Sequence, residues 1–334
     1  MSKPFVSSTS AGRVLNVAKR NPDEIFVEKF VEKWLDYRKR WAAASSGVQP
    51  ERFPLFVRLE SQFKCNSNCA LCIHGHDELK SEIEYKERMT LDVFKRLVDE
   101  CVEYNCPSIA ISFINEPLMD EDFADRLGYV SKSNIMDIHL NSNAQLMTED
   151  VARFIINSNV TRVCFSIDAA TESVYKKMRP NLDFNTVITN INNFIKIRNE
   201  LNKNLPLVRV SFLMNEINIH EKDDFEKIWS EKADYVSFQR YVPISVHNDD
   251  LSRLKKEAPV EGKQYCSYPW ESLFVHGDGV VVPCAAHRGR FISVGNIHSN
   301  TLYEIWNSNE MNNLRNSIKN NKLHDTKLCY TCLN

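Results

Sequence analysis

Between residues 54 and 245, short runs rich in β-branched and aromatic residues alternate with segments whose apolar residues recur at helical spacing. Strands alternating with helices are typical of a parallel sheet with helical crossovers. Six such units are visible, fewer than the eight of a closed barrel, so we predict an α/β fold with a partial (β/α)6 TIM-like barrel. The predicted strands are 55–61, 108–113, 136–142, 160–168, 207–215 and 234–242.

The two flanking segments have different patterns. Residues 1–53 are polar and have helical spacing, but they are too few for a separate domain, so we expect a helical extension. After a polar connector, residues 272–284 alternate around an Asp-Gly pair, which predicts a β-hairpin. A helical pattern over residues 301–319 follows. We therefore divide the chain into an extension (1–53), a barrel core (54–245) and a hairpin-plus-helix domain (246–334).

Composition narrows the class of protein. The chain has 334 residues, 43% of them hydrophobic, which is enough for a sizeable core. A net charge of −2 argues against a nucleic-acid-binding surface. We find neither a signal peptide nor an apolar run long enough to cross a membrane, and expect a cytoplasmic protein. In that compartment the ten cysteines stay reduced, so they are buried residues, metal ligands or catalysts.

Three cysteines follow the first predicted strand directly, at the edge where parallel-sheet enzymes place their sites. Cys65, Cys69 and Cys72 have the spacing Cys-x3-Cys-x2-Cys, and such thiolates favour zinc, copper(I) or iron–sulfur. Zinc prefers a fourth protein ligand, for which His74 and His76 are nearby. An iron–sulfur cluster with three thiolates leaves one iron open for a small molecule. The spacing favours the cluster and leaves zinc as the alternative.

This cysteine loop resembles the signature of the radical S-adenosylmethionine (SAM) enzymes, although Leu71 stands where that family usually has an aromatic residue. The resemblance covers roughly residues 55–245. It implies that Cys65, Cys69 and Cys72 hold a [4Fe–4S] cluster and that SAM chelates the open iron.

The same resemblance implies a set of SAM-binding residues at the ends of the later strands. The stretch Asn-Glu-Pro resembles the family's Gly-Gly-Glu region, which meets the methionine ammonium. A polar turn follows the third strand, and a serine on the fourth would reach the ribose. Solvated loops, and for Asp168 a helix N-cap, are the structural alternatives. The implied residues are Asn115, Glu116, Asn141, Asn143, Ser166, Asp168 and Arg179.

Four further cysteines lie outside the barrel pattern and end in Cys-x2-Cys. On their own they would suit a structural zinc site. Together with the first loop they resemble the twitch domain, the short form of the SPASM domain, which implies one auxiliary [4Fe–4S] cluster with only protein ligands. Electron transfer is the natural role of such a cluster. These cysteines are Cys266, Cys284, Cys329 and Cys332.

For the reaction, the resemblance implies a 5′-deoxyadenosyl radical that abstracts hydrogen from a C–H bond. The tail spacing resembles that of 2-deoxy-scyllo-inosamine dehydrogenase-type twitch enzymes. We therefore expect a small carbohydrate-like substrate (a sugar, aminosugar or cyclitol) oxidised at an alcohol carbon, with the auxiliary cluster as electron acceptor. A flavodoxin- or ferredoxin-type protein would donate the first electron.

Three alternatives remain open at this point. A maturase that modifies a peptide or protein is the second class, and a zinc-stabilised binding protein is a third. A sugar epimerase differs from a dehydrogenase by returning a hydrogen atom, usually from a thiol. Cys164 is the candidate thiol, and Arg240, at the end of the sixth strand, is the candidate substrate-orienting residue.

Overall fold

Six parallel strands form the centre of the computed structural model, which describes residues 5–8, 14–18, 21–240, 266–285, 289–320, 322 and 329. They lie side by side in chain order, as the alternating pattern predicted. All six predicted strands are confirmed. They are β3 (Phe56–Leu59), β4 (Ser108–Ala110), β5 (Asp137–Ser142), β6 (Arg162–Ser166), β7 (Leu207–Met214) and β8 (Tyr235–Arg240).

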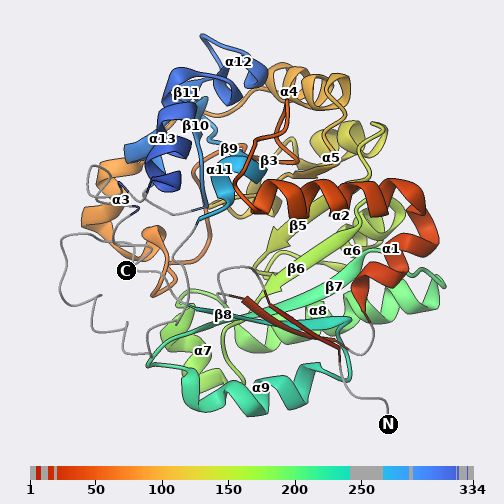
Figure 1. Ribbon diagram of the computed structural model, residues 1–334. Coiled ribbons are helices and arrows are strands. Elements are labelled where there is room, and N and C mark those ends of the chain that lie inside the picture. Colours follow the sequence, from red (N-terminus) through yellow and green to blue (C-terminus); the bar gives the residue numbers. More distant parts are fainter. Residues whose placement is uncertain are drawn as a thin grey trace.

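Helices cover the outer face of these strands (Figure 1). Outward-facing residues such as Val163 and Phe165 pack with helix residues in one large apolar cluster. Burying each such side chain contributes about 1.5–3 kcal/mol. Thr90 is the N-cap of its helix, because its side chain accepts a hydrogen bond from the Val93 amide (3.3 Å). The helices are α3 (Asp77–Ile83), α4 (Leu91–Glu103), α5 (Phe123–Ser131), α6 (Glu149–Asn157), α7 (Glu172–Met178), α8 (Phe184–Glu200) and α9 (Lys222–Trp229), with the short turns η1 (Ile73–Gly75), η2 (Pro117–Met119) and η3 (Ile219–Glu221).

Alternate residues of each strand point away from the helices and form the inner face of the barrel. Many of these inward residues are polar. Cys164 pairs with Asn141 and Arg209 on the neighbouring strands, and Arg209 Nε donates to Cys164 Sγ (2.9 Å). Ser166 pairs with Ser211 one step further toward the carboxyl ends. The barrel interior thus offers hydrogen-bonding groups below the loops that follow the strands.

The N-terminal segment differs from the helical extension that the sequence predicted. The segment contains two helices, but a β-hairpin precedes them. The second strand of this hairpin, β2, pairs antiparallel with β8 and so extends the sheet. Strands this short depend on pairing with a distant strand, which local sequence does not reveal. The elements are β1 (Phe5–Ser8), β2 (Val14–Ala18), α1 (Pro22–Phe30) and α2 (Glu32–Ser45).

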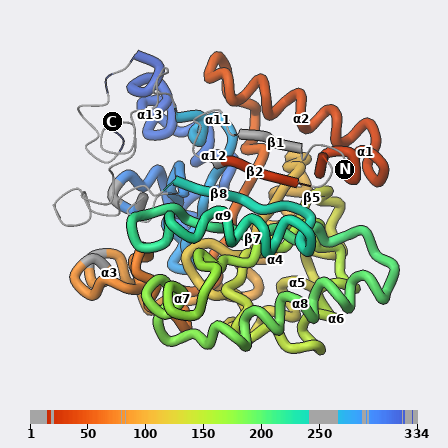
Figure 2. The backbone as a smooth tube through the Cα atoms, turned by 90° about the horizontal axis from the view of Figure 1, so that it is seen from below, coloured from red at the N-terminus to blue at the C-terminus, as the bar shows by residue number. Residues whose placement is uncertain are grey.

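Helices α1 and α2 close the N-terminal end of the barrel. The guanidinium of Arg162 lies over the rings of Phe26 (4.4 Å) and Trp34 (5.1 Å), whose own centroids are 4.2 Å apart. Figure 2 shows α1 and α2 on one side of β7 and β8, with α6 and α8 on the other. Because this end is covered, the site must lie at the carboxyl ends of the strands.

The C-terminal residues form the predicted hairpin and helices, but they also extend the barrel sheet. Strand β9 runs parallel to β3, and β10 returns antiparallel to β9 through the turn at Gly279, whose φ of +91° favours glycine. The domain boundary near residue 245 stays a prediction, since residues 241–265 are outside the described part. The elements are α11 (Tyr268–Glu271), β9 (Ser272–Val275), β10 (Val280–Val282), η5 (Gly289–Ile292), β11 (Gly295–Asn296), α12 (Leu302–Trp306) and α13 (Asn309–Lys319).

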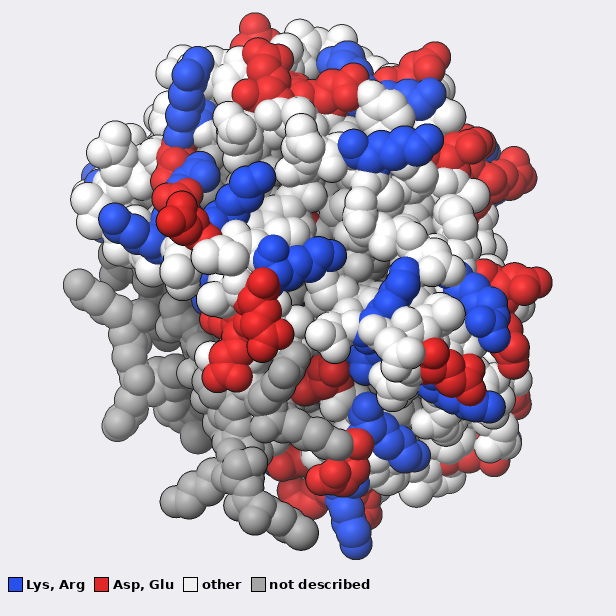
Figure 3. All heavy atoms as spheres, turned by 90° about the vertical axis from the view of Figure 1, so that its right-hand side faces the viewer, with Lys and Arg blue, Asp and Glu red and all other residues white. Residues whose placement is uncertain are grey.

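Contacts between α4 and the C-terminal helices fix this unit to the barrel. The carboxylate of Glu100 accepts from the amides of Leu302 (3.1 Å) and Tyr303 (2.8 Å) at the start of α12. On the face shown in Figure 3, Lys and Arg side chains are interspersed with Asp and Glu. Within the described ranges, no helix is long and apolar enough to span a membrane.

Candidate active site

The three-cysteine loop begins where β3 ends, at the open end of the barrel. Its backbone turns tightly: the Cys72 amide donates to the Cys69 carbonyl (3.0 Å), and the Gly75 amide donates to the Cys72 carbonyl (2.9 Å). A Cβ atom at Gly75 would lie 2.2 Å from the Cys69 carbonyl oxygen, so no side chain fits there. This close packing keeps all three cysteines on one compact turn.

The loop environment holds the thiols in their neutral form. Burial raises the pKa of Cys65 to about 12, and the charges of Glu116 and of the other two thiols add to this. Burial also raises the pKa of Cys69, although the Arg179 guanidinium opposes the shift. Metal binding must displace these protons, because the thiolate is the ligand. Proton release on loading is therefore expected.

Glu116 lies beside this loop, on the segment between β4 and η2. Its amide donates to the Lys64 carbonyl (2.9 Å), which ties the two loops together. Its carboxylate accepts from the Ser142 hydroxyl (2.8 Å) and from the amides of Asn143 (2.8 Å) and Leu118 (3.2 Å). Burial nevertheless raises its pKa to about 7. A cation placed here would stabilise the ionised carboxylate.

The structure separates Asn141 and Asn143, the two asparagines predicted to follow the third strand. Asn143 reaches the cysteine loop: its Nδ2 donates to Asn66 Oδ1 (2.6 Å) and lies 4.0 Å from Cys65 Sγ. Asn141 stands within β5, where its side chain lines a small interior cavity together with Cys164. Asn143 is thus the one that neighbours the cysteine loop.

Asp168 and Arg179 form an ion pair on the opposite side of the loop. Arg179 Nη2 donates to Asp168 Oδ2 (2.5 Å), and Arg179 Nη1 lies 3.5 Å from Cys69 Sγ. Asp168 has a φ of +65° and also accepts from the Leu213 amide (2.7 Å). Thr171, and not Asp168, caps α7. Asp168 positions Arg179, and Arg179 faces the cysteines.

The buried carboxylate of Glu60, which the sequence analysis did not identify, links the strand before the cysteine loop to the loop that carries Glu116. Glu60 Oε1 accepts from the amides of Ile114 (2.9 Å) and Asn115 (3.1 Å). Its Oε2 accepts from the Tyr85 hydroxyl (2.6 Å) and contacts His276 Nδ1 (2.6 Å) on the C-terminal hairpin. Glu60 connects the cysteine strand, the Glu116 loop and the C-terminal unit. Its signal in the sequence was a charge at the end of a buried strand.

The second cysteine group is described only in part. Cys266, Cys284 and Cys329 are half-buried, and Cys332 lies outside the described residues. Burial and the nearby thiols of Cys266 and Cys284 raise the pKa of Tyr268 to about 12, so both cysteines lie near one phenol. Tyr268 also interacts electrostatically with Arg58 on β3. The Tyr268 ring is 37% exposed and packs edge-on against Phe274 at 5.8 Å.

Comparison with protein-family models identifies the family to which the cysteine loop belongs. The model of the radical SAM superfamily matches residues 59–228, just over half of the chain. The chain belongs to the radical SAM superfamily. A second model, the SPASM iron–sulfur cluster-binding domain, matches residues 266–333. SAM and [4Fe–4S] clusters are accordingly the cofactors of this radical SAM protein.

Curated relatives are enzymes with different reactions. GTP 3′,8-cyclase of Saccharophagus degradans is 26% identical over 60% of this chain and 59% of its own length. This radical SAM chain spans about half to three fifths of the cyclases that it matches. A cysteine-type anaerobic sulfatase-maturating enzyme of Clostridium novyi is 26% identical over 80% of this chain and 82% of its own length.

Solved structures share the fold at low identity. BtrN in complex with AdoMet and 2-DOIA has a TM-score of 0.55 at 15% identity, covering 86% of this chain and 95% of that chain. The protein anSMEcpe with bound AdoMet has a TM-score of 0.61 at 16% identity, covering 82% and 84%. Streptococcus suis SuiB bound to precursor peptide SuiA has a TM-score of 0.57 at 14% identity, covering 84% and 71%.

The residues present fit these cofactors. Three sulfur donors on one turn match the soft ligands of an iron–sulfur cluster, in which each thiolate binds a different iron. In the described part of the chain, no three His, Cys, Asp or Glu side chains converge on one point as a single ion requires. Glu116 offers a carboxylate, and Arg179 a guanidinium, on either side of the thiols.

The two predicted catalytic residues have opposite orientations. Cys164 faces the barrel interior, where it lies among polar groups that include Arg209 and Asn141. Arg240 shares its strand parity with Val236 and Phe238, which belong to the apolar cluster of the outer face. This register does not support a substrate contact by Arg240. Gln239 has the inward parity.

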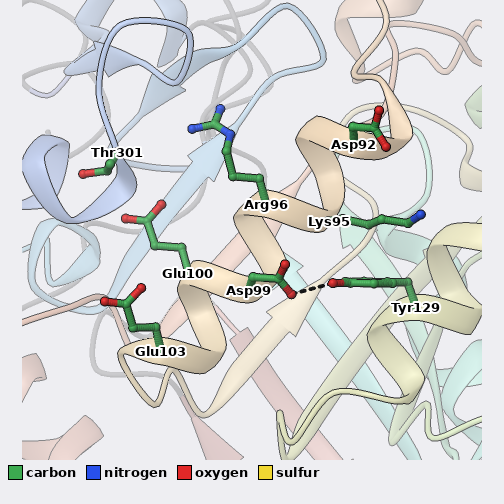
Figure 4. A pocket seen from close by; sticks show the side chains of 8 residues that line it. All are labelled: Asp92, Lys95, Arg96, Asp99, Glu100, Glu103, Tyr129 and Thr301. Carbon is green, nitrogen blue, oxygen red and sulfur yellow. Dashed lines mark hydrogen bonds between the residues drawn. The ribbon is translucent and has the colours of Figure 1, made fainter.

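The two histidines near the cysteines have structural contacts. His76 Nε2 hydrogen-bonds the Ala70 carbonyl (2.7 Å), and the His74 ring packs on Phe63 at 4.4 Å. A surface hollow of about 490 Å³ lies elsewhere, along α4 (Figure 4). There the Tyr129 hydroxyl donates to Asp99 (2.6 Å), and none of the lining residues belongs to the predicted site.

Proposed function

We propose that this radical SAM enzyme oxidises an alcohol carbon of a small hydroxylated molecule of the sugar, aminosugar or cyclitol class. Two neighbouring hydroxyls inside the barrel carry the proposal. Ser166 and Ser211 are paired across β6 and β7 with inward parity. Within the described residues, no group hydrogen-bonds either hydroxyl. A polyol placed there would supply the missing partners.

We assign the cofactors to the two cysteine groups. Cys65, Cys69 and Cys72 would hold the SAM-binding cluster, while the C-terminal cysteines would hold an auxiliary one. When bound, these cofactors supply a 5′-deoxyadenosyl radical that removes a hydrogen atom from the substrate carbon, and an acceptor for the second electron. The hydroxyl proton leaves to solvent, which completes a two-electron oxidation to a carbonyl. A flavodoxin- or ferredoxin-type donor would deliver the initiating electron.

The residues of the chain then have separate tasks. Glu116 would bind the methionine ammonium through its buried carboxylate, and Asn115 would support the same loop through its contact with Glu60. Arg179, held by Asp168, would meet the methionine carboxylate or the cluster thiolates. In place of the ribose contact that the family resemblance implied for Ser166, we assign Ser166, together with its neighbour Ser211, to the orientation of substrate hydroxyls beneath the cofactor.

The test is an anaerobic activity screen with reconstituted protein, SAM and dithionite. We expect 5′-deoxyadenosine and a carbonyl product in equal amounts from one member of a panel of sugars, sugar nucleotides and aminocyclitols. The matched control changes Cys65, Cys69 and Cys72 to Ala. Turnover only with a peptide or protein substrate would replace this proposal by the maturase class, to which the Clostridium novyi relative belongs.

An epimerase is the second candidate, and the position of Cys164 favours it. Its thiol points into the barrel and accepts a hydrogen bond from the Arg209 guanidinium (2.9 Å). A thiol in this place could return a hydrogen atom to a substrate radical. The SPASM match favours the dehydrogenase, because an auxiliary cluster offers a destination for the second electron.

A further inference from the structure

Three arginines occupy inward positions on the barrel strands. Strands of a parallel barrel are usually apolar on both faces, so a charge there requires a counter-charge. Arg162 has one: its Nε lies 3.1 Å from Asp137 Oδ1, and His139 contacts the other oxygen of that carboxylate (2.8 Å). Arg58 and Arg209 are the other two.

Several other half-buried and buried arginines of the described chain have carboxylate or carbonyl acceptors. Arg315 donates to the carbonyls of Pro269 and Trp306. The ion pairs of this kind are Arg126 with Asp120, Arg179 with Asp168, Arg198 with Asp234, and Arg290 with Asp278.

Arg58 and Arg209 depart from this rule. The guanidinium of Arg58 lies over the rings of Phe56 (5.5 Å), Phe113 (6.0 Å) and Phe274 (5.8 Å), and its buried Nε has no hydrogen-bond partner. Among the residues that the structure describes, Arg209 donates only to the sulfur of Cys164. Within the ranges that the structure describes, no carboxylate lies within 4 Å of either group. Burial lowers the pKa of Arg58 to about 10, which reflects this lack of compensation.

The guanidiniums of Arg58 and Arg209 both lie in the part of the barrel interior that contains Cys164. The charge of Arg209 lowers the pKa of Arg58, and both guanidiniums interact electrostatically with Cys164. Cys164 and Tyr235 raise the pKa of Arg209, against the effect of its burial. The cavity that Arg209 lines together with Cys164, on its side toward Arg162 and Tyr235, has a volume of only about 30 Å³ and room for one water at most. A larger ligand must therefore enter from the carboxyl ends of the strands, past Ser166 and Ser211.

We propose that the substrate carries an oxyanion, either a phosphate ester or a carboxylate, which Arg58 and Arg209 bind at the base of the barrel. This inference rests on the proposed function, since it assigns the substrate of that site. A guanidinium matches phosphate and carboxylate as a planar fork of donors. One such anion would compensate these two half-buried charges at once.

The same assignment orients the substrate. On β7, Ser211 stands two residues beyond Arg209, which is about 7 Å along a strand. The anionic end would then point down the barrel, the hydroxyls would lie along Ser166 and Ser211, and the reacting carbon would face the cysteine loop. The apolar rings of Phe56, Phe113 and Phe274 surround the Arg58 guanidinium, and an environment of low polarity strengthens its attraction for an anion.

The experiment measures anion binding without turnover. Inorganic phosphate and acetate are titrated separately into the anaerobically reconstituted, SAM-loaded enzyme, with affinity read from ³¹P line widths and from ¹H saturation transfer. The variants are Arg58→Gln and Arg209→Gln, with Arg58→Lys and Arg209→Lys as charge-retaining forms should a Gln variant fail to fold. Arg153→Gln, on the exposed face of α6, is the matched control.

We expect the wild type to bind at least one of the two anions and each Gln variant to bind it at least tenfold more weakly. The Lys variants should lose less, SAM affinity should not change, and Arg153→Gln should behave as wild type. The probe that binds identifies phosphate or carboxylate. Equal anion binding in wild type and both Gln variants, or none of either probe in the wild type, would overturn the inference. Failure of the activity screen with intact anion binding would refute only the proposed function.

Discussion

Changing Glu116 to Gln should weaken SAM binding by about 1.5–3 kcal/mol, which is about 10- to 150-fold in Kd. Glu116 is 2% exposed, and burial raises its pKa to about 7 from a usual value of 4.5. The difference between these pKa values corresponds to about 3 kcal/mol of free energy that opposes ionisation of the buried Glu116 carboxyl. The methionine ammonium would recover much of that cost, so the two magnitudes agree.

The pH dependence of SAM binding provides a second test of this prediction. Below about pH 7 the wild-type carboxyl is increasingly protonated and no longer attracts a cation. Wild-type affinity should therefore fall, by up to about tenfold per pH unit, as pH is lowered through 7. The Gln variant cannot ionise, so its affinity should stay level over the same range.

Equilibrium dialysis of radiolabelled SAM against reconstituted protein is the assay, at pH values from about 5.5 to 7. Glu149→Gln, an exposed residue at the start of α6, is the matched control and should bind SAM as wild type does. Unchanged affinity in Glu116→Gln, or a level pH profile in the wild type, would remove Glu116 from the SAM site.

Three further predictions concern other parts of the barrel. Asp137→Asn should lower the free energy of unfolding by about 3–5 kcal/mol in urea titrations, because it leaves the buried charge of Arg162 uncompensated; a loss below about 1 kcal/mol would contradict this. Changing Cys266 and Cys284 to Ala should remove about four irons per chain and stop carbonyl formation, while SAM cleavage continues; an unchanged iron content would exclude them as ligands. In deuterated water the product should carry no solvent deuterium at the abstracted carbon. Deuterium there, lost in Cys164→Ala, would favour epimerisation.

Sequence reasoning worked where spacing and strand order determine the outcome. The alternation of strands and helices predicted all six barrel strands. Since parallel strands end at one edge, residues after different strands could be expected to meet there. Glu116 and Asn143 do lie beside Cys65, although they are far apart in the sequence.

Features that depend on register or on distant partners were not predictable in this way. Successive residues of a strand point to opposite faces of the sheet. Knowing that Arg240 ends a strand therefore did not reveal whether its side chain points into the barrel. The β1–β2 hairpin and the Glu60–His276 contact both require a partner over 200 residues away. The arginines inside the barrel had a readable signal, since charges within strands expected to be buried point to a polar interior.

The central claim, that two cysteine groups hold two [4Fe–4S] clusters and that the first one cleaves SAM, is tested most directly by metal analysis. Wild type and the variant with Cys65, Cys69 and Cys72 changed to Ala are reconstituted anaerobically, and iron, sulfide and zinc are measured together with SAM cleavage. We predict about eight irons and eight sulfides per chain in the wild type, about four of each in the variant, and no cleavage by the variant. Bound zinc without labile sulfide in the wild type, or SAM cleavage by the variant, would contradict the account.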